Sequence, residues 1–115
     1  MDDSKYENAM QIIMHAGTAR SCAIKASNAA AKSDFETAER ELKEAQNEMH
    51  EAHKVQFDLV HAEANGHPVE LNIVLVHAQD HLTMAIMSID FAERMIDVYR
   101  RLDALTPSPA DKPEQ

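Results

Sequence analysis

Residues 73–98, IVLVHAQDHLTMAIMSIDFAERMIDV, decide the fold that we predict for this chain. At about 100° per residue, their apolar side chains divide into two faces of one helix. A bundle of three helices needs only one buried stripe on each helix. The second stripe therefore predicts that this helix also contacts other subunits. One face contains Ile73, Val76, Met84, Met87, Phe91 and Val98, together with Asp80, and the nearly opposite face contains Leu75, Leu82, Ile86, Ile89 and Ile96.

The helix around this stretch is expected to span about residues 70–105, after two earlier helices at about 4–32 and 34–64. Small apolar residues recur every three or four positions in both, as the buried face of a packed helix requires. No partner strand is visible for residues 69–76, VELNIVLV, so we reject a strand there. The predicted fold class is all-α, an antiparallel three-helix bundle protomer in residues 1–105. Its expected core positions are Ala9, Ile12, Ala16, Ala19, Ala23, Ala26 and Ala30 in the first helix, and Ala38, Leu42, Ala45, Met49, Ala52, Gln56 and Leu59 in the second.

Short polar segments separate the helices. Residues 33–36, Ser-Asp-Phe-Glu, have the pattern of a capping box, with Ser33 as N-cap and Glu36 bonding back to it. Residues 65–68, Asn-Gly-His-Pro, are typical of a helix end. Residues 106–115 are expected to form a flexible tail. Gly17 lies within the first helix, where a close contact with a neighbour or room for a ligand would explain it.

Composition excludes several classes of function. The net charge of −9 argues against binding a nucleic-acid backbone, which needs clustered Lys and Arg. Cys22 is the only cysteine, so no internal disulfide forms. The first ten residues lack the pattern of a signal peptide, and the longest aliphatic run, residues 73–76, is too short for a membrane span. We expect a cytoplasmic protein.

His77 and His81 are one helical turn apart and are the strongest candidates for chemistry. Such a pair can ligate zinc, or one of its rings can accept a phosphoryl group. Alternatively, both can be ordinary histidines at the interface between helices, with no chemical role. Spacing alone does not separate these alternatives. Counting along antiparallel helices gives four candidate neighbours of His77, each placed to within about one turn: Gln56, His53, His15 and Gly17.

Asp80 lies on a helix face that is otherwise suited to burial. A buried carboxylate needs a partner or a metal ion. Three such groups on the axis of a symmetric trimer would share a cation or protons. The alternative is an ion pair with Arg20 on another helix.

The chain resembles the lactose/cellobiose-type enzyme IIA family of the bacterial sugar phosphotransferase system over about residues 6–102. The matching segments are Gly17–Ser21 (GTARS), Asp34-Phe35, Glu51–Lys54 (EAHK) with Gln56, and Val76–Leu82 (VHAQDHL). The family pattern usually has Met where this chain has Thr83, or shifts that Met to position 84.

This resemblance implies a homotrimer of three-helix protomers with coiled-coil-like packing, in which His77 is phosphorylated. It implies that Asp80 binds a divalent cation, Mg²⁺ in our expectation, on the threefold axis. The histidine phosphocarrier protein would donate the phosphoryl group, and the sugar-specific IIB component would accept it on a cysteine. We expect His81, Gln79 and Gln56 to orient His77 or its phosphate by hydrogen bonds. There is no direct membrane insertion in this scheme.

Two other functions stay open from the sequence. One is a non-catalytic helical oligomer that acts as a regulatory binding protein, and the other is a helical zinc-binding bundle. The sugar is not identified, because lactose, cellobiose and diacetylchitobiose all fit a protein that need not touch the sugar.

Overall fold

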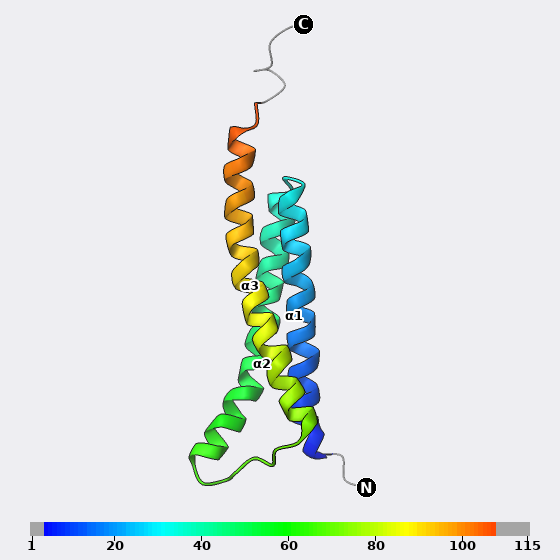
Figure 1. Ribbon diagram of the computed structural model, residues 1–115, viewed down its shortest axis with the longest axis vertical. Helices are drawn as coiled ribbons and strands as arrows, with labels where there is room; N and C mark the ends of the chain where they lie inside the picture. The colour runs from blue at the N-terminus through cyan, green and yellow to red at the C-terminus, as the bar shows by residue number, and fades with distance from the viewer. Residues whose placement is uncertain (1–3, 108–115) are drawn as a thin grey trace, which may run out of the picture.

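The computed structural model describes residues 4–107 and contains three long α-helices. A 3-10 turn at Ser4–Tyr6 leads into α1 (Glu7–Ala31), which is followed by α2 (Phe35–Ala64) and α3 (Ile73–Leu105). Helices α1 and α3 run in one direction and α2 runs in the other (Figure 1). No strand occurs in residues 4–107. The predicted all-α, three-helix protomer is confirmed, and the part of residues 69–76 that is regular is helical.

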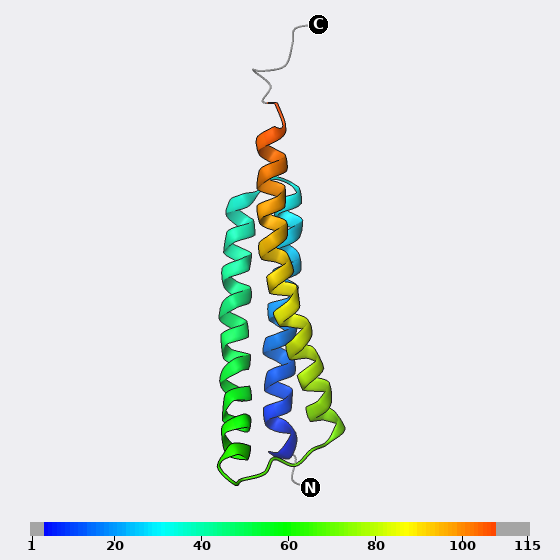
Figure 2. The ribbon, with the colours of Figure 1, turned by 60° about the vertical axis from the view of Figure 1, so that its left-hand side comes forward.

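The core is built mainly from alanine, which allows the helices to approach one another closely. Every core position that the sequence indicated in α1 is buried, and so are those of α2 from Ala38 to Ala52. Gln56 and Leu59, the last two positions of the predicted α2 face, are only half-buried. The reason is that α2 and α3 diverge toward the 65–72 loop, as Figures 1 and 2 both show.

The predicted capping box at Ser33 is wrong. Ser33 has a φ of +63° and ends α1 instead, because the amides of Ser33 and Asp34 donate to the carbonyls of Ala30 and Ala29 at 2.9 Å each. This is the Schellman arrangement, whose left-handed position is usually a glycine. The N-cap of α2 is Asp34, which accepts a hydrogen bond from the Thr37 amide at 3.2 Å.

The connection between α2 and α3 also has a left-handed residue at the end of one helix and a side-chain N-cap at the start of the next. Gly66, with a φ of +84°, ends α2 as the sequence indicated. Helix α3 begins at Ile73, three residues later than predicted, because Asn72 is its N-cap and accepts a hydrogen bond from the Leu75 amide at 2.9 Å. The predicted tail begins with Thr106 and Pro107, and its remaining residues, 108–115, lie outside the described residues.

Helix α3 buries one of its two predicted apolar faces and exposes the other. Leu75, Leu82, Ile89 and Ile96 are buried, whereas Ile86 lies at the edge of this face and is 37% exposed. The second face is open to solvent in the single chain and has no partner among residues 4–107. Its exposed apolar members are Ile73, Val76, Met84, Met87, Phe91 and Val98.

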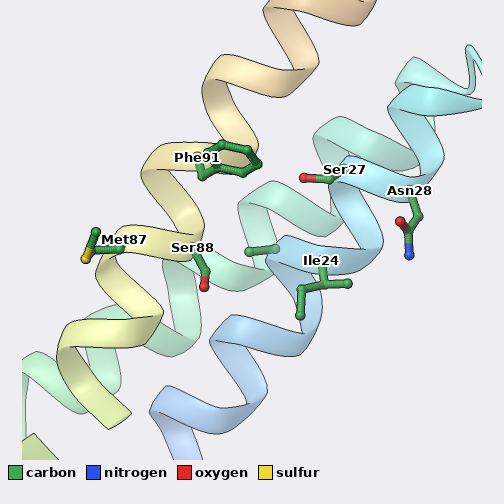
Figure 3. A pocket seen from close by; sticks show the side chains of 7 residues that line it. Ile24, Ser27, Asn28, Met87, Ser88 and Phe91 are labelled. Atoms are coloured by element: carbon green, nitrogen blue, oxygen red, sulfur yellow. The ribbon is translucent and has the colours of Figure 1, made fainter. Parts of the chain in front are cut away.

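An open groove of about 400 Å³ runs between α1 and α3 beside this exposed face (Figure 3). Ile24, Ser27 and Asn28 of α1 line it together with Met87, Ser88 and Phe91 of α3. Across the described part of the chain, none of the helices has the length and hydrophobicity needed to cross a lipid bilayer.

Candidate functional site

The imidazoles of His77 and His81 are in direct contact on α3. Their Nε2 atoms lie 3.0 Å apart, and the rings meet edge to face with centroids 4.5 Å apart. His77 is exposed and His81 is half-buried. At this distance one Nε2–H donates to the lone pair of the other ring, so the two rings hold different tautomers when both are neutral.

Gln56 and Gln79 form a second polar pair on a different flank of α3. Each side-chain amide donates to the carbonyl oxygen of the other at 2.7 Å, which links α2 to α3. His81 lies on the opposite flank, because Ser88, seven residues later and hence nearly on the same side of the helix, lines the groove toward α1. The four polar residues that the sequence grouped around the site thus form two separate pairs within one chain.

The other expected neighbours of His77 have different surroundings. His15 contacts the carboxylate of Glu48 at 2.7 Å, in a half-buried pair between α1 and α2. His53 lines an exposed hollow on α2 with Lys54 and Phe57. A Cβ at Gly17 would meet nothing within 4 Å, so the close contact that the sequence suggested is absent in the single chain.

Lys54, the residue after His53, forms an ion pair at the surface of α2. Its ammonium donates to the carboxylate of Glu51 at 3.1 Å, and this bond and the charge of Lys54 hold the pKa of Glu51 below its ordinary value. Both groups are exposed, so the pair is screened by solvent and contributes little to stability.

Asp80 lies within the exposed face of α3 and is itself exposed in the single chain. It is therefore not buried within the protomer, and residues 4–107 contain no ion pair between it and Arg20. Within the same range, no group of three or more His, Cys, Asp or Glu side chains is placed to hold a metal ion. A single chain offers Asp80 as one carboxylate ligand and no more.

An apolar groove that the sequence did not indicate opens where α2 and α3 diverge. It measures about 460 Å³, and the Gln56–Gln79 pair lies at one side of it. Leu71, just before α3, is 80% exposed here, and Val60 and Val76 are each more than half exposed. The apolar residues ahead of the Asn72 cap were the only sequence signal for this groove. Its lining is completed by Leu59, Glu63, Ala64, Val69 and Leu75.

The arrangement is suited to nucleophilic chemistry on an exposed ring. An imidazole near neutral pH offers a nitrogen lone pair, and a neighbouring N–H can stabilise negative charge that arrives there. His77 is accessible to another protein, and His81 is fixed beside it by one helical turn.

Comparison with known proteins identifies the family. Residues 7–100 match the family model described as "PTS system, Lactose/Cellobiose specific IIA subunit". The chain belongs to this family. The predicted resemblance is therefore confirmed, and the chain is a component of a sugar phosphotransferase system.

Curated relatives of this IIA family differ in the sugar that their names give. The lactose-specific EIIA component of Streptococcus mutans is 37% identical over 91 residues, covering 79% of this chain and 88% of the relative. The lichenan-specific IIA component of Bacillus subtilis is also 37% identical, over 102 residues, covering 89% and 93%.

A solved structure shares the fold. The cellobiose-specific enzyme IIA from Bacillus anthracis superposes with a TM-score of 0.89 at 34% identity, covering 92% of this chain and 97% of that one.

Proposed function

We propose that this chain is a phosphocarrier that takes a phosphoryl group on His77 and passes it to a sugar-specific partner. Membership of the IIA family supports the general role in phosphotransfer. The observation that carries the site assignment is the exposed His77 ring, with His81 Nε2 at 3.0 Å from its own Nε2.

The transfer needs two exchanges of one phosphoryl group. In the first, the N–P bond of the phosphorylated histidine phosphocarrier protein breaks as an N–P bond to His77 forms. In the second, the bond to His77 breaks as a P–S bond forms to a cysteine of the IIB component. Phosphoryl transfer depends mainly on in-line positioning and on donors around the equatorial oxygens. His81 is a suitable donor in the tautomer that carries a proton on Nε2, because this N–H can turn from His77 to a phosphate oxygen.

Gln56 and Gln79 act at a distance from the imidazole pair in this proposal. Their two mutual hydrogen bonds tie α3 to α2 beside the open groove. They are positioning residues, which fix the helix that presents His77 rather than bonding its phosphate within the same chain.

We further propose that the protein works as a homotrimer with α3 at its centre. The support is the unpartnered apolar face of α3, since soluble monomers rarely expose so continuous an apolar stripe. Burying that face around a threefold axis would bring three copies of Asp80 together. A carboxylate oxygen is the ligand type that Mg²⁺ prefers, so the three residues fit a shared divalent cation, which would offset their repulsion. No metal ion takes part in the transfer steps above.

The substitution Asp80→Leu tests this cation site. We expect it to remove bound Mg²⁺ and to keep or strengthen the trimer, because apolar residues often replace buried charges without loss of stability. Metal content by elemental analysis and mass by light scattering measure the two effects. A trimer that falls apart in this variant would show instead that the cation holds it together.

We propose that the protein acts in the cytoplasm together with these two partners. The substrate is proposed to be a β-linked disaccharide of the lactose, cellobiose or diacetylchitobiose class. The exact sugar depends on the IIB partner.

Transfer to IIB tests the function as a whole. The chain is first phosphorylated with phosphoenolpyruvate and the two general phosphotransferase proteins, then repurified and mixed with purified IIB components of the three sugar classes. We expect the phosphoryl group to move to the cysteine of a IIB component. A chain that never takes up phosphate, or that keeps it in the presence of every IIB component, would contradict the proposal.

A further inference from the structure

The Nε2 atoms of His77 and His81, which share a proton in the free protein, are also close enough to bind one metal ion together. Two nitrogens that bind one tetrahedral Zn²⁺ at 2.0–2.1 Å are about 3.3 Å apart. In the free protein the two Nε2 atoms converge to 3.0 Å on the solvent side of α3. A separation increase of a few tenths of an ångström, within ordinary rotation of exposed rings, would bring both lone pairs onto one ion.

The pair also meets the requirements for the protonation state of a zinc ligand. Each neutral ring binds through Nε2 when its proton is on Nδ1. The hydrogen bond between the rings requires one of them to be in this form already, so only the other must exchange tautomers. His77 is exposed and His81 is half-buried, so water can complete the coordination shell of the ion.

We propose that His77 and His81 form a two-ligand site for Zn²⁺ or a similar transition-metal ion, and that occupation of this site blocks phosphorylation. In this proposal Nε2 of His77 is the nitrogen that accepts the phosphoryl group, so the two events exclude each other because both use its lone pair. Since residues 4–107 offer no third His, Cys, Asp or Glu in the same group, the site is open and exchangeable, unlike a structural zinc site. The site is distinct from the proposed cation at Asp80, which would use carboxylate oxygens.

Binding is tested on the untagged full chain, independently of any phosphotransfer. ZnCl₂ is titrated while long-range proton–nitrogen spectra record the histidine rings. We expect the Nε2 signals of His77 and His81 to shift together, with one ion bound per chain, and this binding to be lost in both His77→Gln and His81→Gln. The control His53→Gln, which alters an exposed ring on α2, should keep it. Shifts at His53 instead, or binding unchanged in His81→Gln, would overturn the site.

The consequence for catalysis rests on the proposed function and is measured separately. Phosphoryl uptake from purified phosphorylated donor should stop when ZnCl₂ occupies the site and return when EDTA is added. His81→Gln, compared with its own rate without zinc, should lose this sensitivity. Zinc binding without inhibition would refute the exclusion, whereas absence of uptake even without zinc would refute the proposed function and leave the binding result intact.

Discussion

The two polar pairs that involve residues of α3 differ in their position and exposure. The His77–His81 contact lies on the flank toward α1 and leaves a ring exposed, whereas the Gln56–Gln79 pair lies toward α2 and is half-buried. Paired amides satisfy each other's polar groups where the bundle opens. In the proposed function, the first pair provides the reactive group, and the second fixes the helix that carries it.

Removing one glutamine should destabilise the protein more than removing both. Gln79→Leu leaves the amide of Gln56 half-buried without its partner, and we expect a loss of about 1 kcal/mol in the free energy of unfolding. The double variant Gln56→Leu, Gln79→Leu should recover most of that loss, because it leaves no unpaired amide. Urea unfolding measures the wild type, Gln56→Leu, Gln79→Leu and the double variant.

The control for this cycle is Gln46→Leu, which removes an exposed hydrogen bond to Glu93 of 3.1 Å. Its effect should stay within about 0.5 kcal/mol. Additive effects of the two glutamine substitutions would show that the pair is not coupled.

Sequence spacing was sufficient for one of these pairs only. The contact between His77 and His81 follows from their separation by one helical turn. The Gln56–Gln79 bond depends on how α2 and α3 are rotated and splayed, which periodicity does not determine to better than about one turn. For the same reason, the pairing of His15 with Glu48 was not anticipated.

Among the secondary-structure elements, the connection between α1 and α2 shows how the preferences for ending one helix and starting the next compete for the same residues. Ser33 and Asp34 are both good N-cap residues, and either one followed three positions later by a donor would suit α2. The left-handed turn that ends α1 requires one residue in between, and Ser33 takes that position with a φ of +63°. Its hydroxyl then donates to Asp103 of α3 at 2.7 Å, a contact between distant segments that local sequence rules do not include.

The Asp34 cap predicts a specific dependence of stability on pH. The hydrogen bonds from Thr37 lower the pKa of Asp34 below its ordinary value. A carboxyl group whose pKa is lower in the folded state stabilises the protein above its unfolded pKa. That contribution is lost as the pH falls through the folded pKa, so it should disappear on the acid side of about pH 4.

The matched variant for this prediction is Asp34→Ser, which keeps a capping oxygen but cannot titrate. Thermal unfolding of the wild type and the variant should differ most near neutral pH and converge in acid. A melting-temperature difference that stays constant from pH 7 to pH 3 would rule out the carboxylate of Asp34 as its source.

For the molecule as a whole, the apolar face of α3 that lies open to solvent is a feature that the single chain does not account for. The sequence anticipated two apolar stripes, and the structure buries one of them and leaves the other open. The second stripe predicts contact with other subunits, but a periodic pattern does not give their number, so the trimer was inferred only through the family resemblance. The groove between α2 and α3 was not predicted because it comes from the divergence of two helices, and the apolar residues ahead of the Asn72 cap are its only signal in the sequence.

The substitution Phe91→Glu should break the proposed trimer. Phe91 is 62% exposed in the single chain, in the middle of the open face. A charge buried there in three copies would be unpaired and costly. Sedimentation should give three times the 12.9 kDa chain mass for the wild type and a single chain for the variant. Leu71→Glu, at an exposed apolar residue outside α3, is the control and should remain trimeric. A wild-type protein that sediments as a single chain would refute the trimer outright.

Phosphate uptake at His77 is the most direct test of the central claim. The wild type, His77→Gln and the control His53→Gln are each incubated with phosphoenolpyruvate and the two general phosphotransferase proteins, and intact mass and acid lability are measured. We predict one acid-labile phosphoryl group per chain in the wild type and in His53→Gln, and none in His77→Gln. Equal uptake by His77→Gln and the wild type would contradict the assignment of His77 as the phosphoryl acceptor.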